Sequence, residues 1–313
     1  MQRAMTILIF AGALLYSACS ESAMTDATCP PEEGIAIQVL GSGGPIADDA
    51  RASSSFLVWL DGKARILIDA GGGSFLRFGE ASANFADLKF IGLSHFHADH
   101  SADFPALLKS GYFSNRDGPL MLAGPSGSQR FPGLAKYLSG ILDPSDGAYA
   151  YLSGYLDGTG GLARIEPYEV SGTTSPSKNL LQGSGGKIAI YAMHVPHGIV
   201  PAIAFRIEVR GKSIVFASDQ NGSDNEFAKF AGNASVLVMH MPISELATSG
   251  ARQLHAPPSK IAQIAARADA DSLLLSHFMA RSLRNLEENV QIVREGYAGK
   301  LLIAEDLYCL AVP

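Results

Sequence analysis

The stretch Ser94-His95-Phe96-His97-Ala98-Asp99-His100 follows an apolar run at residues 90–93 and precedes a second apolar segment. The first run predicts a short buried strand, and residues 103–108 predict the helix that follows it. The stretch therefore forms the turn between a strand and a helix, a place where rigid elements commonly hold functional side chains.

Three imidazoles and one carboxylate lie within six residues in this turn. Zinc accepts both kinds of ligand. Because residues two apart on an extended backbone point the same way, His95 and His97 share one direction, whereas Asp99 and His100 lie beyond the turn. The arrangement predicts two neighbouring metal ions, which lie about 3.5–4 Å apart in two-metal hydrolases. A solvated polar loop is the alternative, and the density of ligand side chains argues against it.

The pattern His95-x-His97-x-Asp99-His100 resembles the signature of the metallo-β-lactamase superfamily. It is most similar to the ribonuclease Z-like branch, which also contains arylsulfatases and cyclic-nucleotide phosphodiesterases. Further pieces match in order over residues 35–281. The resemblance implies an α/β fold, a four-layer αββα sandwich with two sheets face to face, helices outside and metal ions at one edge. Periodicity alone supports only a mixed α and β domain.

The resemblance also implies the metal ligands. His277 lies in a segment similar to the family's His-Phe-Ser-Ser-Arg element, and Asp219 lies in Ser-Asp-Gln where the family has Gly-Asp-Thr. His197 fits a His-Gly element that supplies an imidazole, with His194 as the alternative. The implied ligands of one ion are His95, His97 and His197; those of the other are Asp99, His100 and His277, with Asp219 between the two ions.

Supporting roles follow from the same resemblance. Asp69 lies in an Asp-x-Gly element that hydrogen-bonds to the metal loop without binding metal. His240 or His255 is expected to protonate the leaving oxygen, and a structural role is the alternative for His255 at a helix start. Met241 stands at the glutamate position of the His-Glu-Ala-Thr element of ribonuclease Z proteins, which argues against that enzyme's proton-transfer apparatus.

The implied activity is that of a binuclear hydrolase in which a metal-bound hydroxide, oriented by Asp99, attacks a small phosphodiester or a related ester. The expected cofactors are two divalent ions, with Zn²⁺ favoured and Mn²⁺ or iron as alternatives. An arylsulfatase is the first alternative activity, followed by a β-lactamase or a lactonase, because all of them share these ligands. A metal-free binding or scaffold protein is the non-enzymatic alternative, which the filled ligand positions disfavour.

Composition bounds the partners. The chain has 313 residues, of which 47% are hydrophobic and 17% charged, as in a globular protein with a sizeable core. Thirty acidic against 24 basic residues give a net charge of −6, and no basic run occurs. Because nucleic-acid binders carry a basic face, no nucleic acid is expected as a partner. A small anionic substrate fits, since bound metal ions supply positive charge locally.

Residues 1–18 are expected to be a signal peptide, because Arg3 precedes an apolar segment at residues 7–15 that is too short to span a bilayer. Ser17-Ala18-Cys19 is similar to a bacterial lipoprotein cleavage site with Cys19 as the lipidated residue, and cleavage after Ser20 is the alternative. Either reading predicts export, to the periplasm or to a membrane reached only through Cys19. Residues 19–33 predict a tether and residues 34–313 the hydrolase domain.

The sequence leaves two interpretations open for the cysteine pair and two for the tyrosines of residues 143–186. Cys29 and Cys309 either form a disulfide, which an oxidising compartment permits, or stay unpaired. Residues 143–186, rich in Gly, Ser, Thr and Pro, predict an insertion in the hydrolase domain. Its tyrosines either form an aromatic rim over the substrate or pack within the insertion; they are Tyr149, Tyr151 and Tyr155. No pattern indicates an oligomeric state.

Overall fold

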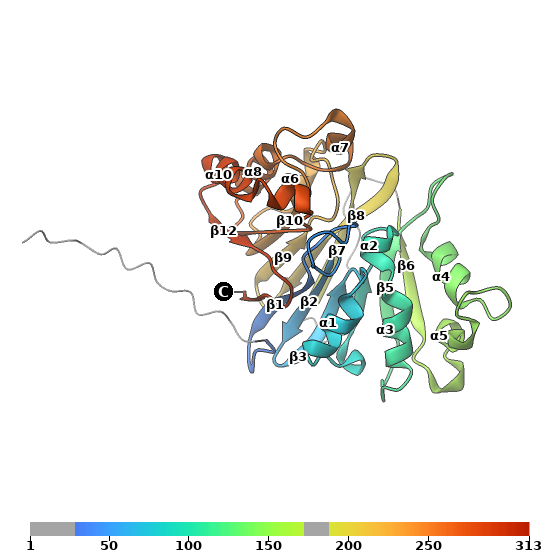
Figure 1. Ribbon diagram of the computed structural model, residues 1–313. Helices are drawn as coiled ribbons and strands as arrows, with labels where there is room; N and C mark the ends of the chain where they lie inside the picture. Colours follow the sequence, from blue (N-terminus) through green and yellow to red (C-terminus); the bar gives the residue numbers. More distant parts are fainter. Residues whose placement is uncertain (1–28, 172–187, 313) are drawn as a thin grey trace, which may run out of the picture.

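The computed structural model describes residues 29–171 and 188–312, so the expected signal peptide lies outside the described residues. Figure 1 shows two β-sheets packed face to face, with helices on the outer side of each sheet. This arrangement confirms the expected αββα sandwich. Among the helices of the described ranges, none is both long enough and apolar enough to cross a bilayer.

The first sheet has seven strands in the order β13-β1-β2-β3-β4-β5-β6. The expected hairpin joins β2 to β3, and its turn residues Asp61 and Gly62 both have positive φ, as the twist of paired strands favours. Strands β3 to β6 run parallel. The strands are β1 Ile35–Gly41, β2 Ser55–Leu60, β3 Lys63–Ile68, β4 Phe90–Gly92, β5 Leu120–Pro125, β6 Ile165–Val170 and β13 Cys309–Ala311.

The second sheet has six strands in the order β12-β11-β10-β9-β8-β7. Its strands β7, β8 and β9 are antiparallel, and β9 to β12 run parallel. The sheet thus repeats the plan of the first one, a hairpin followed by parallel strands. The strands are β7 Ile188–His197, β8 Val200–Val209, β9 Lys212–Phe216, β10 Val236–His240, β11 Ser272–Ser276 and β12 Lys300–Ile303.

Two apolar cores hold the layers together. Between the sheets, Phe56 of β2 meets Phe216 of β9 with ring centroids 5.3 Å apart, and Phe90 meets Phe205 at 5.8 Å. The second core lies between the first sheet and its helices and includes Trp59. The helices are α1 Ser74–Glu80, α2 Ala98–Ser101, α3 Phe104–Gly111, α4 Leu134–Leu142, α5 Gly154–Asp157, α6 Glu226–Phe230, α7 Ser249–Leu254, α8 Pro258–Arg267, α9 Ala280–Leu283 and α10 Leu286–Gly296.

Part of the expected insertion at residues 143–186 belongs to the first sheet. Strand β6 pairs in parallel with β5 over six positions, from Ile165 to Val170. Only these two terminal residues of β6 are buried, and the four residues between them, Glu-Pro-Tyr-Glu, are exposed. The strand therefore lacks the alternation of apolar and polar residues that identifies a strand in sequence. Residues 172–187 of the expected insertion lie outside the described residues.

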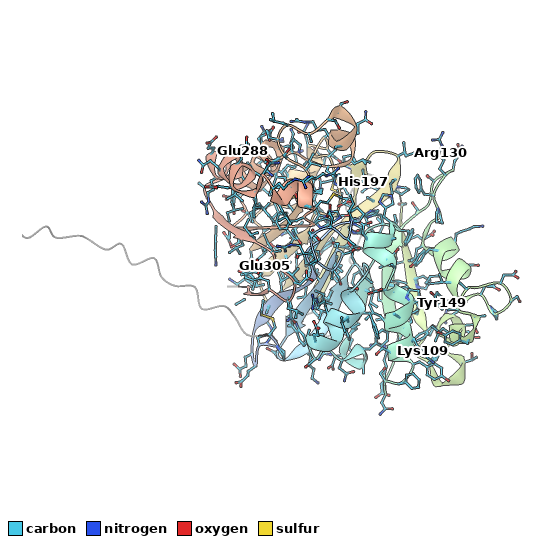
Figure 2. All side chains as sticks on the ribbon, in the orientation of Figure 1. Lys109, Arg130, Tyr149, His197, Glu288 and Glu305 are labelled. Atoms are coloured by element: carbon cyan, nitrogen blue, oxygen red, sulfur yellow. A yellow bond between two sulfur atoms is a disulfide. The ribbon has the colours of Figure 1, made fainter. Side chains whose placement is uncertain are left out.

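The tyrosines of this region do not surround the metal ligands. Tyr155 is buried, and its hydroxyl donates to the carbonyl oxygen of Leu108 at 2.8 Å. Tyr151 is exposed and packs on Lys109, whose Nζ lies 5.1 Å from its ring centroid. Figure 2 shows Tyr149 and Lys109 on the side of the molecule away from His197. The aromatic-rim interpretation is therefore wrong: Tyr151 and Tyr155 contact α3, and Tyr149 packs on Tyr151.

Cys29 and Cys309 form a disulfide, which resolves the choice between paired and free thiols. The bond spans 280 positions and holds the start of the described chain against β13, which pairs with β1. A cross-link that closes a loop of this length removes much conformational freedom from the unfolded chain.

We expect Cys29→Ser to lower the free energy of unfolding by about 2–4 kcal/mol, a typical value for the loss of a disulfide. Urea unfolding followed by circular dichroism measures this change. Cys309→Ser and the double variant should match Cys29→Ser, and dithiothreitol should destabilise only the wild type. Equal stability of wild type and Cys29→Ser would show that the bond contributes nothing.

Candidate metal centre

Seven of the eight histidines gather at one edge of the sandwich. Parallel strands place their carboxyl ends at the same edge of a sheet, where sites in α/β proteins commonly lie. His197, labelled in Figure 2, marks this edge. Asp69 follows β3, His95 follows β4, His97 precedes α2, Asp99 and His100 lie in α2, His197 ends β7, Asp219 follows β9, His240 ends β10, His255 follows α7 and His277 follows β11.

The backbone of several strand ends is strained at this edge. Asp69, Ser218 and His277 adopt the left-handed region with φ of 59°, 58° and 57°, which few non-glycine residues do. Such strain clusters at functional sites. The glycine-rich loop after β1 passes close by, since a Cβ on Gly44 would lie 3.0 Å from Cε1 of His277. A side chain at this position would press on the buried ring of His277.

The first group of ligand-type atoms comes from His95, His97 and His197, whose nitrogens lie within 4.8 Å of one another. His95 Nε2 is 3.0 Å from His97 Nδ1. His197 Nδ1 donates to the carbonyl oxygen of Leu254 at 2.9 Å, so its Nε2 carries the lone pair. That buried Nε2 has no hydrogen-bond partner among the described residues. A divalent ion would satisfy these converging nitrogens, so the residues fit the expected metal.

The protonation states of this group suit metal binding. Burial lowers the pKa of His95 well below its usual value, and the neighbouring histidines add to the effect. Burial also lowers the pKa of His97. Both rings are therefore neutral at pH 7, as a metal ligand must be.

The second group comprises His100, Asp219, His240 and His277, whose ligand-type atoms lie within 4.8 Å of one another, and the expected ligand Asp99 lies beside it. His277 Nε2 lies 3.1 Å from His100 Nε2 and 3.2 Å from Asp99 Oδ2. Asp219 faces both groups: its Oδ1 is 3.4 Å from His277 Nε2, and its Oδ2 is 3.7 Å from His197 Nε2. A carboxylate has two oxygens and can bind two cations, so Asp219 is placed where a bridging ligand would lie.

The carboxylates of this group are anionic. Burial would raise the pKa of Asp219, but His277, His255 and His100 hold it well below its usual value. His100 and His277 likewise outweigh burial and lower the pKa of Asp99. The pocket therefore concentrates negative charge among imidazoles, which favours a divalent cation.

A hydrogen-bonded support lies behind the second group. His100 Nδ1 donates to Asp69 Oδ2 at 2.7 Å, so its Nε2 is directed at His277. The same carboxylate accepts the backbone N–H of Ser94 at 2.7 Å and the Ser94 hydroxyl at 2.8 Å. The expected bonding of Asp69 to the metal loop is confirmed. Ser94, whose Oγ also lies 3.1 Å from His95 Nδ1, was missed because serine is no typical metal ligand.

His240 and His255 both contact Asp219, in different ways. His240 Nδ1 donates to Asp219 Oδ1 at 2.7 Å, whereas His255 Nδ1 lies 3.8 Å from Asp219 Oδ2 and has no hydrogen-bond partner among the described residues. Burial lowers the pKa of His240 to about 4 and that of His255 to about 3, so both rings are neutral at pH 7. The geometry suits His240 for positioning Asp219 and leaves His255 available to a leaving oxygen. Met241 is fully buried in the larger of the two apolar cores.

His194 does not join the cluster, so the alternative to His197 is excluded. It lies three positions before His197 on β7, and side chains an odd number of positions apart point to opposite faces of a strand. Its Nε2 lies 3.4 Å from the carbonyl oxygen of Val170 instead.

We expect Asp69→Asn to weaken metal binding by about 10–100-fold, the usual effect of losing an outer partner of a ligating histidine. Competition with a chromogenic chelator measures the affinity. Asp117→Asn, at an exposed position, is the control and should bind metal like the wild type. An unchanged affinity in Asp69→Asn would mean that His100 needs no such support.

We expect His197→Ala to lower the metal content by about one ion per chain, because the first group keeps only two of its three nitrogens. Mass spectrometry of metals in the purified protein gives the content. His194→Ala removes an imidazole from the same strand and should keep the full content. Equal contents in the two variants would contradict the placement of a metal ion at His197.

Curated relatives and solved structures match most of the chain. Ribonuclease Z of Mycobacterium marinum is 26% identical over 290 residues, which cover 89% of this chain and 99% of the relative. Ribonuclease Z of Methanosarcina acetivorans is 26% identical over 302 residues, with 88% and 98% covered. The crystal structure of human tRNase Z, short form, superposes with a TM-score of 0.67 at 19% identity, covering 89% of this chain and 99% of that one. The metallo-beta-lactamase fold protein YhfI from Bacillus subtilis gives 0.67 at 18%, with 88% and 98% covered.

These relatives correct one expectation. Nucleic acid was excluded as a partner from the net charge of −6 and the lack of a basic run, yet the relatives are named as ribonucleases. The exclusion was wrong because a net charge sums over the whole surface. It says nothing of positive charge that metal ions or a few side chains supply at one place.

The sequence model described as "Beta-lactamase superfamily domain" matches residues 64–278. This range contains every histidine and aspartate of the two groups, from His95 to His277. Together with the four-layer fold, the match means that the chain belongs to the metallo-β-lactamase superfamily and is a metal-dependent hydrolase.

Proposed function

We propose that this hydrolase cleaves phosphodiester bonds with two metal ions. The main support for this proposal is that Asp219 faces both ligand groups, with Oδ1 toward His277 and Oδ2 toward His197. Two cations held on the two sides of Asp219 would suit a tetrahedral anion, because both would neutralise charge that develops on its oxygens. The ribonuclease Z relatives support the same bond class, since their name refers to cleavage of RNA.

When bound, the ions would polarise a water and the phosphate. His95, His97 and His197 would hold one ion, and Asp99, His100 and His277 the other. The chain's own groups set the remaining geometry. Asp99 is ionised and has a second oxygen that can accept a hydrogen bond from the attacking water. The neutral ring of His255 can donate a hydrogen bond to the leaving oxygen, and the proton that this oxygen finally takes up is the one that the attacking water releases.

We propose Zn²⁺ as the metal in both positions, with Mn²⁺ or iron as alternatives. The support is the donor set, in which nitrogen ligands dominate the first group. Imidazole nitrogen is a preferred zinc ligand, whereas Mn²⁺ favours oxygen donors.

A small phosphodiester or related ester is the first proposed substrate, and an RNA phosphodiester is the second candidate. The small substrate is compatible with Met241 in place of the glutamate of the ribonuclease Z element. RNA is favoured by the relatives, which match this chain over nearly their full length. Sulfate esters, β-lactams and lactones are the comparison substrates, since the same fold and ligands can serve them.

We propose export as the setting of this activity. The disulfide between Cys29 and Cys309 supports it, because disulfides persist in oxidising compartments and are rare in the cytosol. Lipidation of Cys19 remains a prediction from the sequence. Mass spectrometry of the mature protein from a native membrane fraction tests it.

We expect a chelator to abolish hydrolysis and Zn²⁺ to restore it, with a phosphodiester as the fastest substrate of a chromogenic panel. The panel comprises a phosphodiester, a phosphomonoester, a sulfate ester, a β-lactam and a lactone, and initial rates give kcat/KM for each. Asp219→Ala should reduce the phosphodiester rate by at least about 100-fold, since removing charge stabilisation of a transition state has effects of this size. A sulfate ester or lactone hydrolysed faster than the phosphodiester would overturn the proposal.

A further inference from the structure

A cavity of about 700 Å³ lies between the loop at residues 126–133 and helix α4. We call it the β5–α4 groove, since the loop joins these two elements. Arg130, Phe131, Lys136 and Tyr137 supply the cationic and aromatic side chains of its lining. The groove combines apolar surface with a few polar groups, as ligand sites do, and the proposed hydrolysis gives it no role.

The groove lies beside the metal centre. Strand β5 runs parallel to β4, so the loops after the two strands leave the sheet at the same edge. The ring of Tyr137 stacks on that of Phe96, with centroids 4.4 Å apart and planes 7° from parallel. The hydroxyl of Tyr137 donates to the carbonyl oxygen of Ser101 at 3.1 Å. Phe96 stands between His95 and His97, so the wall of the groove packs directly on the metal-binding loop.

The groove carries positively charged side chains, although the chain as a whole has a negative net charge. The protein carries −6, yet Arg130 and Lys136 line the groove; the carboxylate of Glu169 adjoins it and accepts the backbone N–H of Ala135 at 2.9 Å. Neither cation forms an ion pair with any residue in the described ranges. Residues 172–187 contain no aspartate or glutamate that could neutralise them. Two unpaired cations beside aromatic rings are the chemistry that binds a nucleotide, with phosphate on the cations and base on the rings.

We propose that the β5–α4 groove binds the nucleotide adjacent to the scissile phosphodiester. The inference rests on the proposed phosphodiester hydrolysis and specifies its substrate: a chain of at least two nucleotides with a second phosphate. The scissile phosphate lies at the metal centre, and the second phosphate binds Arg130 and Lys136. The adjacent base or sugar packs against Phe131 and Tyr137.

The test compares dinucleotides that differ by one phosphate. The substrates are ApA, pApA and ApAp, and kcat/KM is measured for each with the zinc-loaded protein. We expect the wild type to prefer pApA or ApAp over ApA by about 10-fold, the effect of one charge-assisted contact. Arg130→Gln/Lys136→Gln should reduce this preference to about 1. The control Lys63→Gln/Arg164→Gln removes two exposed cations, one at the first residue of β3 and one just before β6. These positions lie at the strand ends away from the metal centre, so the control should keep the preference.

Equilibrium binding separates failure of the groove from failure of the proposed function. Calorimetry gives the affinity for AMP, which has no diester bond, and for inorganic phosphate and adenosine. We expect AMP to bind most tightly and Arg130→Gln/Lys136→Gln to weaken it by about 10-fold. Phosphodiester hydrolysis without any effect of these substitutions would overturn the groove proposal alone. AMP binding that depends on them, in a protein that cleaves no phosphodiester, would overturn the proposed function alone. If AMP bound no more tightly than inorganic phosphate or adenosine, the groove would not recognise a nucleotide, and the groove proposal would be overturned.

Discussion

The structure depends on holding anionic carboxylates and imidazoles together in a buried pocket, where Asp69, Asp99 and Asp219 outweigh burial and raise the pKa of His100 well above its usual value. Removing such groups from water is unfavourable unless each has a partner. Asp69 meets this requirement with Ser94 and His100, and Asp219 meets it with His240. Other groups, such as His197 Nε2, have no hydrogen-bond partner in the described part of the chain. A divalent ion would complete the pairing, so metal binding and the stability of this edge are linked.

The sandwich supplies the framework for this pocket. Each sheet consists of a hairpin followed by parallel strands, and the parallel strands direct their last residues to a common edge. The left-handed turns at Asp69, Ser218 and His277 then redirect the chain immediately after β3 and β11 and near the end of β9. Such conformations are stable only when the surrounding structure enforces them. The two apolar cores provide that enforcement, since they fix the strands on both sides of the first sheet.

Much of this could be predicted from the sequence, because the ligand motif is dense and lies at the end of a recognisable strand. The Asp-Gly hairpin, the helix after His100 and the ordered ligand motifs all carry strong local patterns. Strand β6 was missed because Glu166, Pro167 and Glu169 interrupt its apolar pattern, and it forms by pairing with β5. The choice between His194 and His197 needed the register of β7, and the role of Ser94 needed three-dimensional contacts. The partner class was misjudged because charge was counted over the whole chain.

The disulfide has a geometric consequence. Strand β1 ends in the loop that contacts His277, whereas Cys309 pairs with Gln38 in the middle of that strand, so the bond to Cys29 lies beside β1 and short of the loop. Whatever is attached ahead of Cys29, whether a lipid, a resin or a fused domain, is therefore joined beside β1 and away from the loop at His277. An enzyme immobilised through that end would present its catalytic rim to the surrounding solution.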